Sequence, residues 1–190
     1  GAFVPSEKTC IVYGNAALQS IAEAFAADWK EMFGNALQVK AGKPQAGDFY
    51  LTLKKDKKLG KEGYAIAVAK YVTVSAPETT GVYWATRTLL QIGEQSDNHA
   101  LPHGTVRDWP DYSVRGFMMD CGRKFIPMAY MRDLVKMMSY YKMNVLQVHL
   151  NDNGFKQFFG HDWSKTYAAF RLECETFPRS DCPRWLLHQT

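Results

Sequence analysis

The sequence predicts an α/β protein in which a mixed sheet with two helices is followed by a separate strand–helix–strand unit. Apolar residues alternate in several short runs, as in strands, and recur at spacings of three and four in other runs, as in helices. A polar, turn-rich stretch at residues 96–104 separates the two halves. Hydrophobic residues make up 46% of the 190 residues, so the chain can bury a core.

The first strand and helix follow from the first of these patterns. The apolar run CIVY (10–13) predicts a strand, and the residues after it predict a helix that Gly34 and Asn35 end. The apolar residues of this helix fall on one face. They are Leu18, Ile21, Ala22, Phe25, Trp29, Met32 and Phe33.

Three more strand segments and a second helix complete the first half. The strand segments are ALQVKAG (36–42), DFYLTLK (48–54) and YAIAVAKYVTVSA (64–76). The lysine-rich stretch at 54–63 is interpreted as a solvated hairpin connection. Pro77 and Glu78 open the second helix, whose small-residue face suits close packing on a sheet. That face comprises Gly81, Ala85, Thr88, Leu89 and Ile92.

The second half predicts a βαβ crossover. RGFMMD (115–120) and NVLQVHL (144–150) are apolar on both faces, as strands of a helix-covered parallel sheet are. Between them a helix is expected from Pro127 to about Lys142. Its buried stripe is expected to comprise Met131, Leu134, Val135, Met138 and Tyr141.

Composition and absent motifs exclude several classes of function. No GxGxxG and no GxxxxGK[ST] motif occurs, so no nucleotide cofactor is expected. No apolar run reaches the roughly 18–20 residues of a membrane span. The net charge of +4 is a mild excess without interleaved aromatic residues in the basic stretch, so no nucleic-acid partner is expected.

Metal binding is not expected either. The cysteines form no CxxC pair, and His161–Asp162 has no third ligand at metal spacing. The cysteines are Cys10, Cys121, Cys174 and Cys182, and their redox state stays open.

Candidate functional residues follow the two strands of the second half. Ligands of parallel α/β sheets bind beyond the carboxyl ends of the strands, where Asp120 and Arg123 follow one strand and His149 and Asp152 the other. Arg123 offers a planar fork of donors for sugar hydroxyls or a carboxylate. A structural ion pair of Arg123 with Asp152, and a core role for His149, remain open alternatives.

The residues from 115 to 153 resemble the opening of the catalytic barrel of glycoside hydrolase family 20, the β-N-acetylhexosaminidases. That family begins its barrel with Arg-Gly-x-x-x-Asp-x-x-Arg, followed by a helix ending in Tyr-Lys-Met/Leu-Asn and a strand ending in His-x-x-Asp. The upstream residues 62–91 resemble the accessory α/β domain that precedes this barrel. The matching barrel positions are Arg115, Gly116, Asp120, Arg123, Lys142, Asn144, His149 and Asp152.

The resemblance implies a domain organisation. We expect an accessory α/β domain at residues 1–100, a linker at 101–114 and the first βαβ portion of an incomplete TIM barrel at 115–178. Residues 179–190 do not resemble the family and are interpreted as an out-of-frame tail, with a natural short tail as the alternative.

The resemblance also implies a function. The family removes terminal N-acetylhexosamine residues from glycans by a substrate-assisted retaining route, in which an adjacent Asp–Glu pair positions the acetamido group and protonates the leaving oxygen. Arg123 would bind the terminal sugar, while Asp120, His149 and Asp152 would support the site from behind. No Asp–Glu dipeptide occurs in the sequence, so we expect no catalytic residue and no activity in this chain alone. The alternative is a non-catalytic glycan-binding or interaction module.

Partners and location follow from the same interpretation. The expected partner is a glycan with terminal N-acetylglucosamine or N-acetylgalactosamine, and the expected location is outside the cytoplasm, with a signal peptide already removed. Two parallel strands cannot close a barrel, so we expect the chain to form a homodimer through them, with fold-back onto the accessory domain as the alternative.

Overall fold

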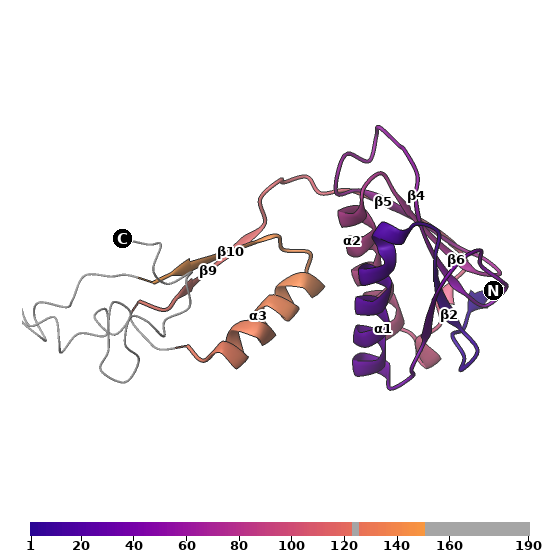
Figure 1. Ribbon diagram of the computed structural model, residues 1–190, viewed down its shortest axis with the longest axis horizontal. Helices are drawn as coiled ribbons and strands as arrows, with labels where there is room; N and C mark the ends of the chain where they lie inside the picture. The colour runs from indigo at the N-terminus through magenta and orange to yellow at the C-terminus, as the bar shows by residue number, and fades with distance from the viewer. Residues whose placement is uncertain (123–125, 151–190) are drawn as a thin grey trace, which may run out of the picture. The chain divides into compact units, whose positions relative to one another are not determined.

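The computed structural model describes residues 1–122 and 126–150 (Figure 1). The chain divides into two units, Gly1–Ser113 and Val114–Thr190. The strands of the first unit are β1 (Ala2–Phe3), β2 (Cys10–Tyr13), β3 (Gln38–Ala41), β4 (Phe49–Leu53), β5 (Tyr64–Val68), β6 (Val72–Ala76), β7 (Leu101–Pro102) and β8 (Gly104–Asp108). Its helices are η1 (Ala16–Leu18), α1 (Gln19–Phe33), α2 (Thr79–Glu94) and η2 (Asp97–His99).

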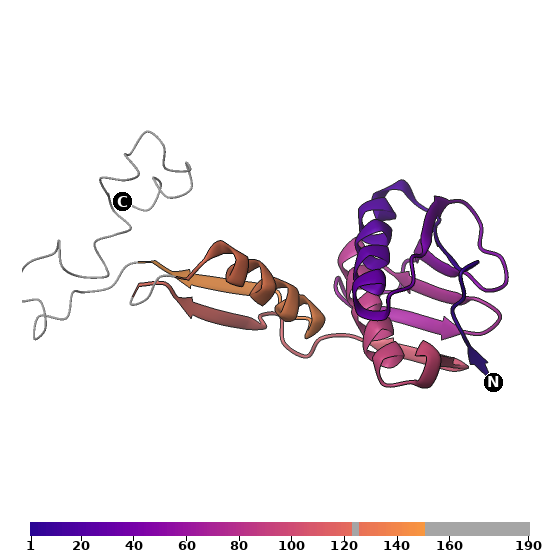
Figure 2. The ribbon, with the colours of Figure 1, turned by 90° about the horizontal axis from the view of Figure 1, so that it is seen from below.

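The main sheet of the first unit has six strands in the order β3-β2-β4-β6-β5-β8. β2 runs parallel to β3 and β4, and β4 runs parallel to β6. β5 is antiparallel to both β6 and β8, which makes the sheet mixed. Helices α1 and α2 lie on the same face of this sheet (Figures 1 and 2). The prediction of a mixed sheet with two helices is therefore confirmed.

Aromatic packing between α1 and the sheet forms the centre of the core. Phe25, Trp29 and Phe49 are fully buried. The ring centroid of Trp29 lies 5.7 Å from that of Phe25 and 5.3 Å from that of Phe49. Phe33 continues the contact, with its centroid 4.5 Å from Trp29. Because Phe33 fills this position, the preceding Met32 points away and is 37% exposed, against the expectation for the buried face.

One strand lies where the sequence suggested a linker. Residues 104–108 form β8, which pairs with β5 from Gly104↔Val68 to Asp108↔Tyr64. β8 is an edge strand whose side chains are exposed or half-buried, so its sequence carries little apolar alternation. The first unit accordingly extends to Ser113.

Gly81 explains the small-residue face of α2. A Cβ atom added there would overlap the carbonyl oxygen of Gly63 and lie 2.8 Å from Cβ of Ala76 at the end of β6. Helix and sheet therefore approach as closely as only glycine permits.

Gly81→Ala is expected to destabilise the chain although alanine is the better helix former. The gain of about 1 kcal/mol in helix propensity is outweighed by overpacking against backbone, leaving a net loss of about 1–3 kcal/mol in unfolding free energy. Gly93→Ala in the same helix is the matched control, because the atoms nearest to its Cβ would be side-chain ring atoms of Phe33 and Trp29 at 3.3–3.4 Å. Urea unfolding followed by circular dichroism checks both. Equal stabilities of the two variants would contradict the packing argument.

The described part of the second unit is a parallel βαβ crossover, as predicted. It consists of β9 (Gly116–Asp120), α3 (Met128–Tyr140) and β10 (Val145–His149). The two strands are parallel, from Gly116↔Val145 to Asp120↔His149. In α3 Leu134 and Met138 are buried, whereas Val135 and Tyr141 are 50% and 65% exposed. The buried stripe is narrower than expected because the described residues offer this helix only two strands to pack on.

Candidate functional site

The carboxyl ends of β9 and β10 bring two of the predicted site residues together. Asp120 and His149 are register partners at the last position of each strand, and both are half-buried. The backbone N–H of Cys121 donates to the carbonyl of His149 at 2.9 Å. The N–H of Gly122 donates to Asp120 Oδ1 at 2.8 Å, so this carboxylate shapes the turn that follows β9.

Two further predicted residues, Arg123 and Asp152, lie outside the described residues. Each follows one of the paired strand ends by three positions in the sequence. The predicted sugar contact of Arg123 and the supporting role of Asp152 stay predictions.

The amino end of the same strand pair holds the other half of the barrel motif. The backbone N–H of Arg115 donates to Asn144 Oδ1 at 2.9 Å, and the side-chain Nε of Arg115 donates to the carbonyl of Lys142 at 2.7 Å. The backbone N–H of Asn144 donates to the carbonyl of Arg115 at 2.9 Å. These bonds join the start of β9 to the turn between α3 and β10. This end of the strands is thus fixed by Arg115, Lys142 and Asn144. It lies opposite the end that carries Asp120 and His149.

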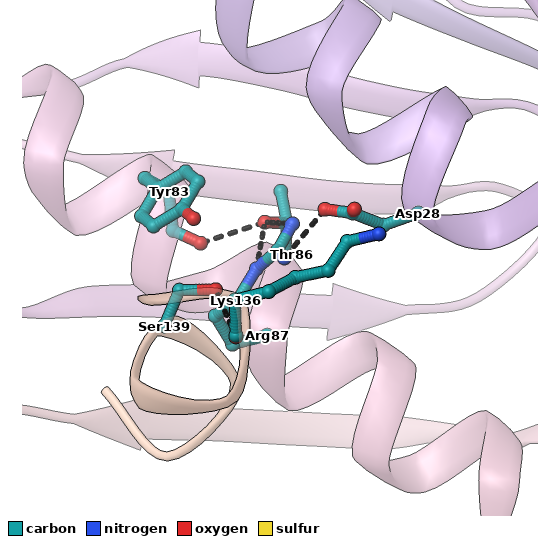
Figure 3. Close-up of polar contacts among 6 residues, drawn as sticks. All are labelled: Asp28, Tyr83, Thr86, Arg87, Lys136 and Ser139. Carbon is teal, nitrogen blue, oxygen red and sulfur yellow. Dashed lines mark hydrogen bonds and ion pairs between the residues drawn. The ribbon is translucent and has the colours of Figure 1, made fainter. Parts of the chain in front are cut away.

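A buried ion pair in the first unit was not foreseen from the sequence (Figure 3). Arg87 on α2 is 3% exposed, and its Nη1 donates to Asp28 Oδ2 on α1 at 2.6 Å. Its Nε and Nη2 donate to Thr86 Oγ1 at 3.1 and 3.0 Å, and the guanidinium lies 4.6 Å from the centroid of the Tyr83 ring. Because each nitrogen of the guanidinium has a partner within the first unit, we interpret the cluster as stabilising the packing of α1 on α2.

A second polar cluster fastens the end of β8. The hydroxyl of Tyr64 donates to Asp108 Oδ2 at 2.5 Å and lies 2.6 Å from Thr88 Oγ1 on α2. Burial raises the pKa of the Tyr64 hydroxyl far above its ordinary value, and the hydrogen bond to Asp108 raises that pKa further. Tyr64 therefore stays neutral and acts as a donor that links β5, β8 and α2.

The structure provides no metal cluster within residues 1–122 and 126–150. In those same ranges, no helix has the length and apolar character needed to cross a membrane. Cys10 and Cys121 are free thiols, the first buried and the second half-buried.

Comparisons with known proteins match both units. The model of the glycosyl hydrolase family 20 domain 2 matches residues 1–109, and that of the family 20 catalytic domain matches residues 112–158. A beta-hexosaminidase of Vibrio furnissii is 30% identical over 142 residues, which cover 73% of this chain and 21% of that protein. A beta-hexosaminidase of Akkermansia muciniphila is 41% identical over 75 residues, covering 38% of this chain and 15% of that protein. The chain thus spans about a fifth of the length of such curated relatives.

Solved structures show the same fold. The family 20 β-N-acetylhexosaminidase of Streptomyces coelicolor aligns with a TM-score of 0.67 at 22% identity, over 80% of this chain and 32% of that chain. The exo-β-N-acetylglucosaminidase of Vibrio harveyi, solved with N-acetylglucosamine, aligns with a TM-score of 0.67 at 20% identity, over 80% of this chain and 24% of that chain.

Proposed function

Because the chain belongs to glycoside hydrolase family 20, we propose that it forms part of a β-N-acetylhexosaminidase that removes terminal N-acetylhexosamine residues from glycans. One observation carries this proposal. The accessory-domain match at 1–109 and the catalytic-domain match at 112–158 occur in order and almost without a gap. An accessory fold alone could precede another enzyme, whereas this succession specifies the family 20 arrangement.

The proposed reaction divides the work between substrate and protein. The 2-acetamido oxygen of the substrate attacks the anomeric carbon, an aspartate orients that group, and a glutamate protonates the leaving oxygen. Neither acid is assigned to this chain, whose sequence lacks an Asp–Glu dipeptide. The contribution proposed for this chain is sugar binding by Arg123, with Asp120, His149 and Asp152 supporting the site.

The test uses the whole reading frame. The DNA on both sides of codons 1–190 is sequenced, the complete protein is expressed, and hydrolysis of p-nitrophenyl N-acetyl-β-D-glucosaminide is measured. The β-D-glucoside, which lacks the acetamido group, should be cleaved slower by several orders of magnitude. Arg123→Ala should lower kcat/KM for the N-acetylated substrate by about 10²-fold or more, since the proposed charged contact to the sugar is lost. Equal rates on both substrates would refute the proposal.

We also propose that two copies of this chain associate through β9 and β10. Phe117, Met118 and Val145 on these strands are 43%, 57% and 40% exposed. Within the described residues each strand has a single neighbour, which leaves the other strand edge open. Exposed apolar edge strands pair with other chains.

Light scattering coupled to size exclusion should therefore give the mass of a dimer at micromolar concentration. Met118→Lys combined with Val145→Lys should give a monomer, since lysine on an edge opposes pairing, and the same double change at exposed Val4 and Met32 is the control. A monomeric parent chain whose residues 115–150 exchange amide hydrogens slowly would instead support fold-back. Export from the cytoplasm stays a prediction.

A further inference from the structure

An open depression of about 570 Å³ lies on the first unit, and all its lining residues belong to that unit. It is lined by the connection from β4 to β5 and by the segment after β8. Tyr64 and Asp108 are register partners of β5 and β8, so residues before Tyr64 and residues after Asp108 leave the sheet at the same end. The lining residues are Lys57, Lys58, Leu59, Gly60, Lys61, Glu62, Trp109, Pro110, Asp111 and Ser113.

The loop that carries the lysines is held in place. Leu59 is 4% exposed and anchors the loop in the core, and its carbonyl accepts from the N–H of Gly63 at 3.0 Å. Glu62 Oε2 accepts from the indole N–H of Trp84 on α2 at 2.8 Å. The opposite wall begins at Asp108, which the Tyr64 hydroxyl fastens. Both segments that line the depression therefore begin at residues held by burial or hydrogen bonds.

The lining carries a small excess of positive charge, with Lys57, Lys58 and Lys61 against the carboxylates of Glu62 and Asp111. The carboxylate of Asp56 forms an ion pair with Arg107, whose Nη1 lies 2.8 Å from Asp56 Oδ2. The hydrogen bond from Arg107 lowers the pKa of Asp56. Lys57, Lys58 and Lys61 are exposed on the rim. The ion pairs found in the described part of the chain involve Lys40, Arg87 and Arg107, and none of these three lysines.

The wall opposite the lysine loop carries an aromatic side chain. Trp109 is 51% exposed although it is the largest apolar side chain of the lining, and Pro110 follows it. The flat indole can stack against the apolar face of a pyranose ring, while the indole N–H can face water. Beside it, the exposed carboxylate of Asp111 can accept from sugar hydroxyls. The volume lies within the range of small-ligand sites, and the open side suits a polymer that continues beyond the depression.

We propose that this depression is a binding site for an anionic sugar of a glycan chain, with the ring on Trp109 and its carboxylate or sulfate on Lys58 and Lys61. The choice of a sugar over another anionic ligand with flat rings rests on the proposed function. The site would hold an acidic, hexosamine-containing polymer on the accessory domain while cleavage takes place elsewhere.

Isothermal titration of the 190-residue chain tests the proposal with defined probes. A hyaluronan hexasaccharide supplies the carboxylate, N-acetylglucosamine 6-sulfate supplies the sulfate, and N-acetylchitohexaose is the neutral counterpart. Binding of at least one anionic probe, weakened by salt and at least about fivefold tighter than the neutral one, is expected. The indole N–H resonance that disappears in Trp109→Phe should shift on titration.

Variants locate the site. Lys58→Gln with Lys61→Gln should weaken binding about fivefold, and Trp109→Ala about tenfold. Lys43→Gln with Lys8→Gln removes the same charge from exposed positions outside the lining and should leave binding unchanged. All these side chains are exposed, so the variants should keep the parent circular dichroism spectrum and melting temperature.

Three outcomes would overturn the proposal: no binding of either anionic probe, equal binding of the neutral probe, or tighter binding of a hexathymidylate at Trp109, which would indicate a nucleic-acid site. Because binding is measured without turnover, its failure leaves the hydrolase proposal intact. Conversely, a complete protein without hydrolase activity would not affect the binding result.

Discussion

The 190-residue chain alone is expected to hydrolyse p-nitrophenyl N-acetyl-β-D-glucosaminide no faster than buffer does. Its sequence contains no Asp–Glu dipeptide, so we assign neither the general acid nor the aspartate that orients the acetamido group to a residue of this chain. Loss of a general acid alone removes about 10²–10⁴ in rate, and loss of the orienting group adds to that. The purified chain and the protein from the complete reading frame are compared in the same chromogenic assay.

The control for this prediction is the elution profile. Hydrolase contamination from the expression host gives activity that does not follow the chain through size exclusion and ion exchange. Activity that coincides with the chain in both separations would show that other carboxylates of this chain perform the chemistry, and would contradict the prediction that the chain alone is inactive.

Trp29→Ala is expected to cause the largest loss of stability among single substitutions in the first unit. The indole is fully buried and contacts Phe25, Phe33 and Phe49 across the interface of α1 with the sheet. Truncation leaves a cavity that the surrounding rings cannot fill, at a cost of about 3–5 kcal/mol. Urea unfolding followed by far-ultraviolet circular dichroism measures it without relying on the fluorescence of the residue removed.

Trp29→Phe is the informative partner of this variant. Trp29 Nε1 is buried without a hydrogen-bond acceptor among the residues that the structure describes. Replacing the indole by a phenyl ring leaves a small void but also removes an unsatisfied N–H, so the unfolding free energy should change by about 1 kcal/mol or less. If phenylalanine were as damaging as alanine, the N–H would have to contribute through a bond that this geometry does not contain.

Local patterns in the sequence were sufficient for most secondary structure. Apolar spacing predicted α1 and α2, and runs apolar on both faces predicted the parallel pair β9 and β10. Such patterns show which side of a helix or strand is buried, and they can be recognised within a few consecutive residues. The edge strand β8 escaped detection because an edge strand with exposed faces has no such pattern.

The candidate site was predicted in the same way, and with the same limit. The motif spacing predicted that Asp120 and His149 lie at adjacent strand ends. They are register partners at the last position of β9 and β10. The spacing could not separate these residues from Arg115 and Asn144, which occur in the same motif but fasten the other end of the strands. The distinction depends on which backbone carbonyl and which side-chain oxygen the Arg115 donors reach.

The sequence by itself determined the fold class, the family and the two strand ends of the candidate site. Each of these three features depends on apolar periodicity or motif spacing within a short stretch of chain. Tertiary structure alone decided that Arg87 is neutralised by Asp28 on another helix and that Trp109 lies beside a lysine loop about fifty positions earlier. Pairing across a sheet or between helices joins residues whose separation in sequence is set by topology. Strand register and side-chain packing therefore decide which residues become partners. Neither register nor packing can be recognised from a local pattern in the amino-acid sequence.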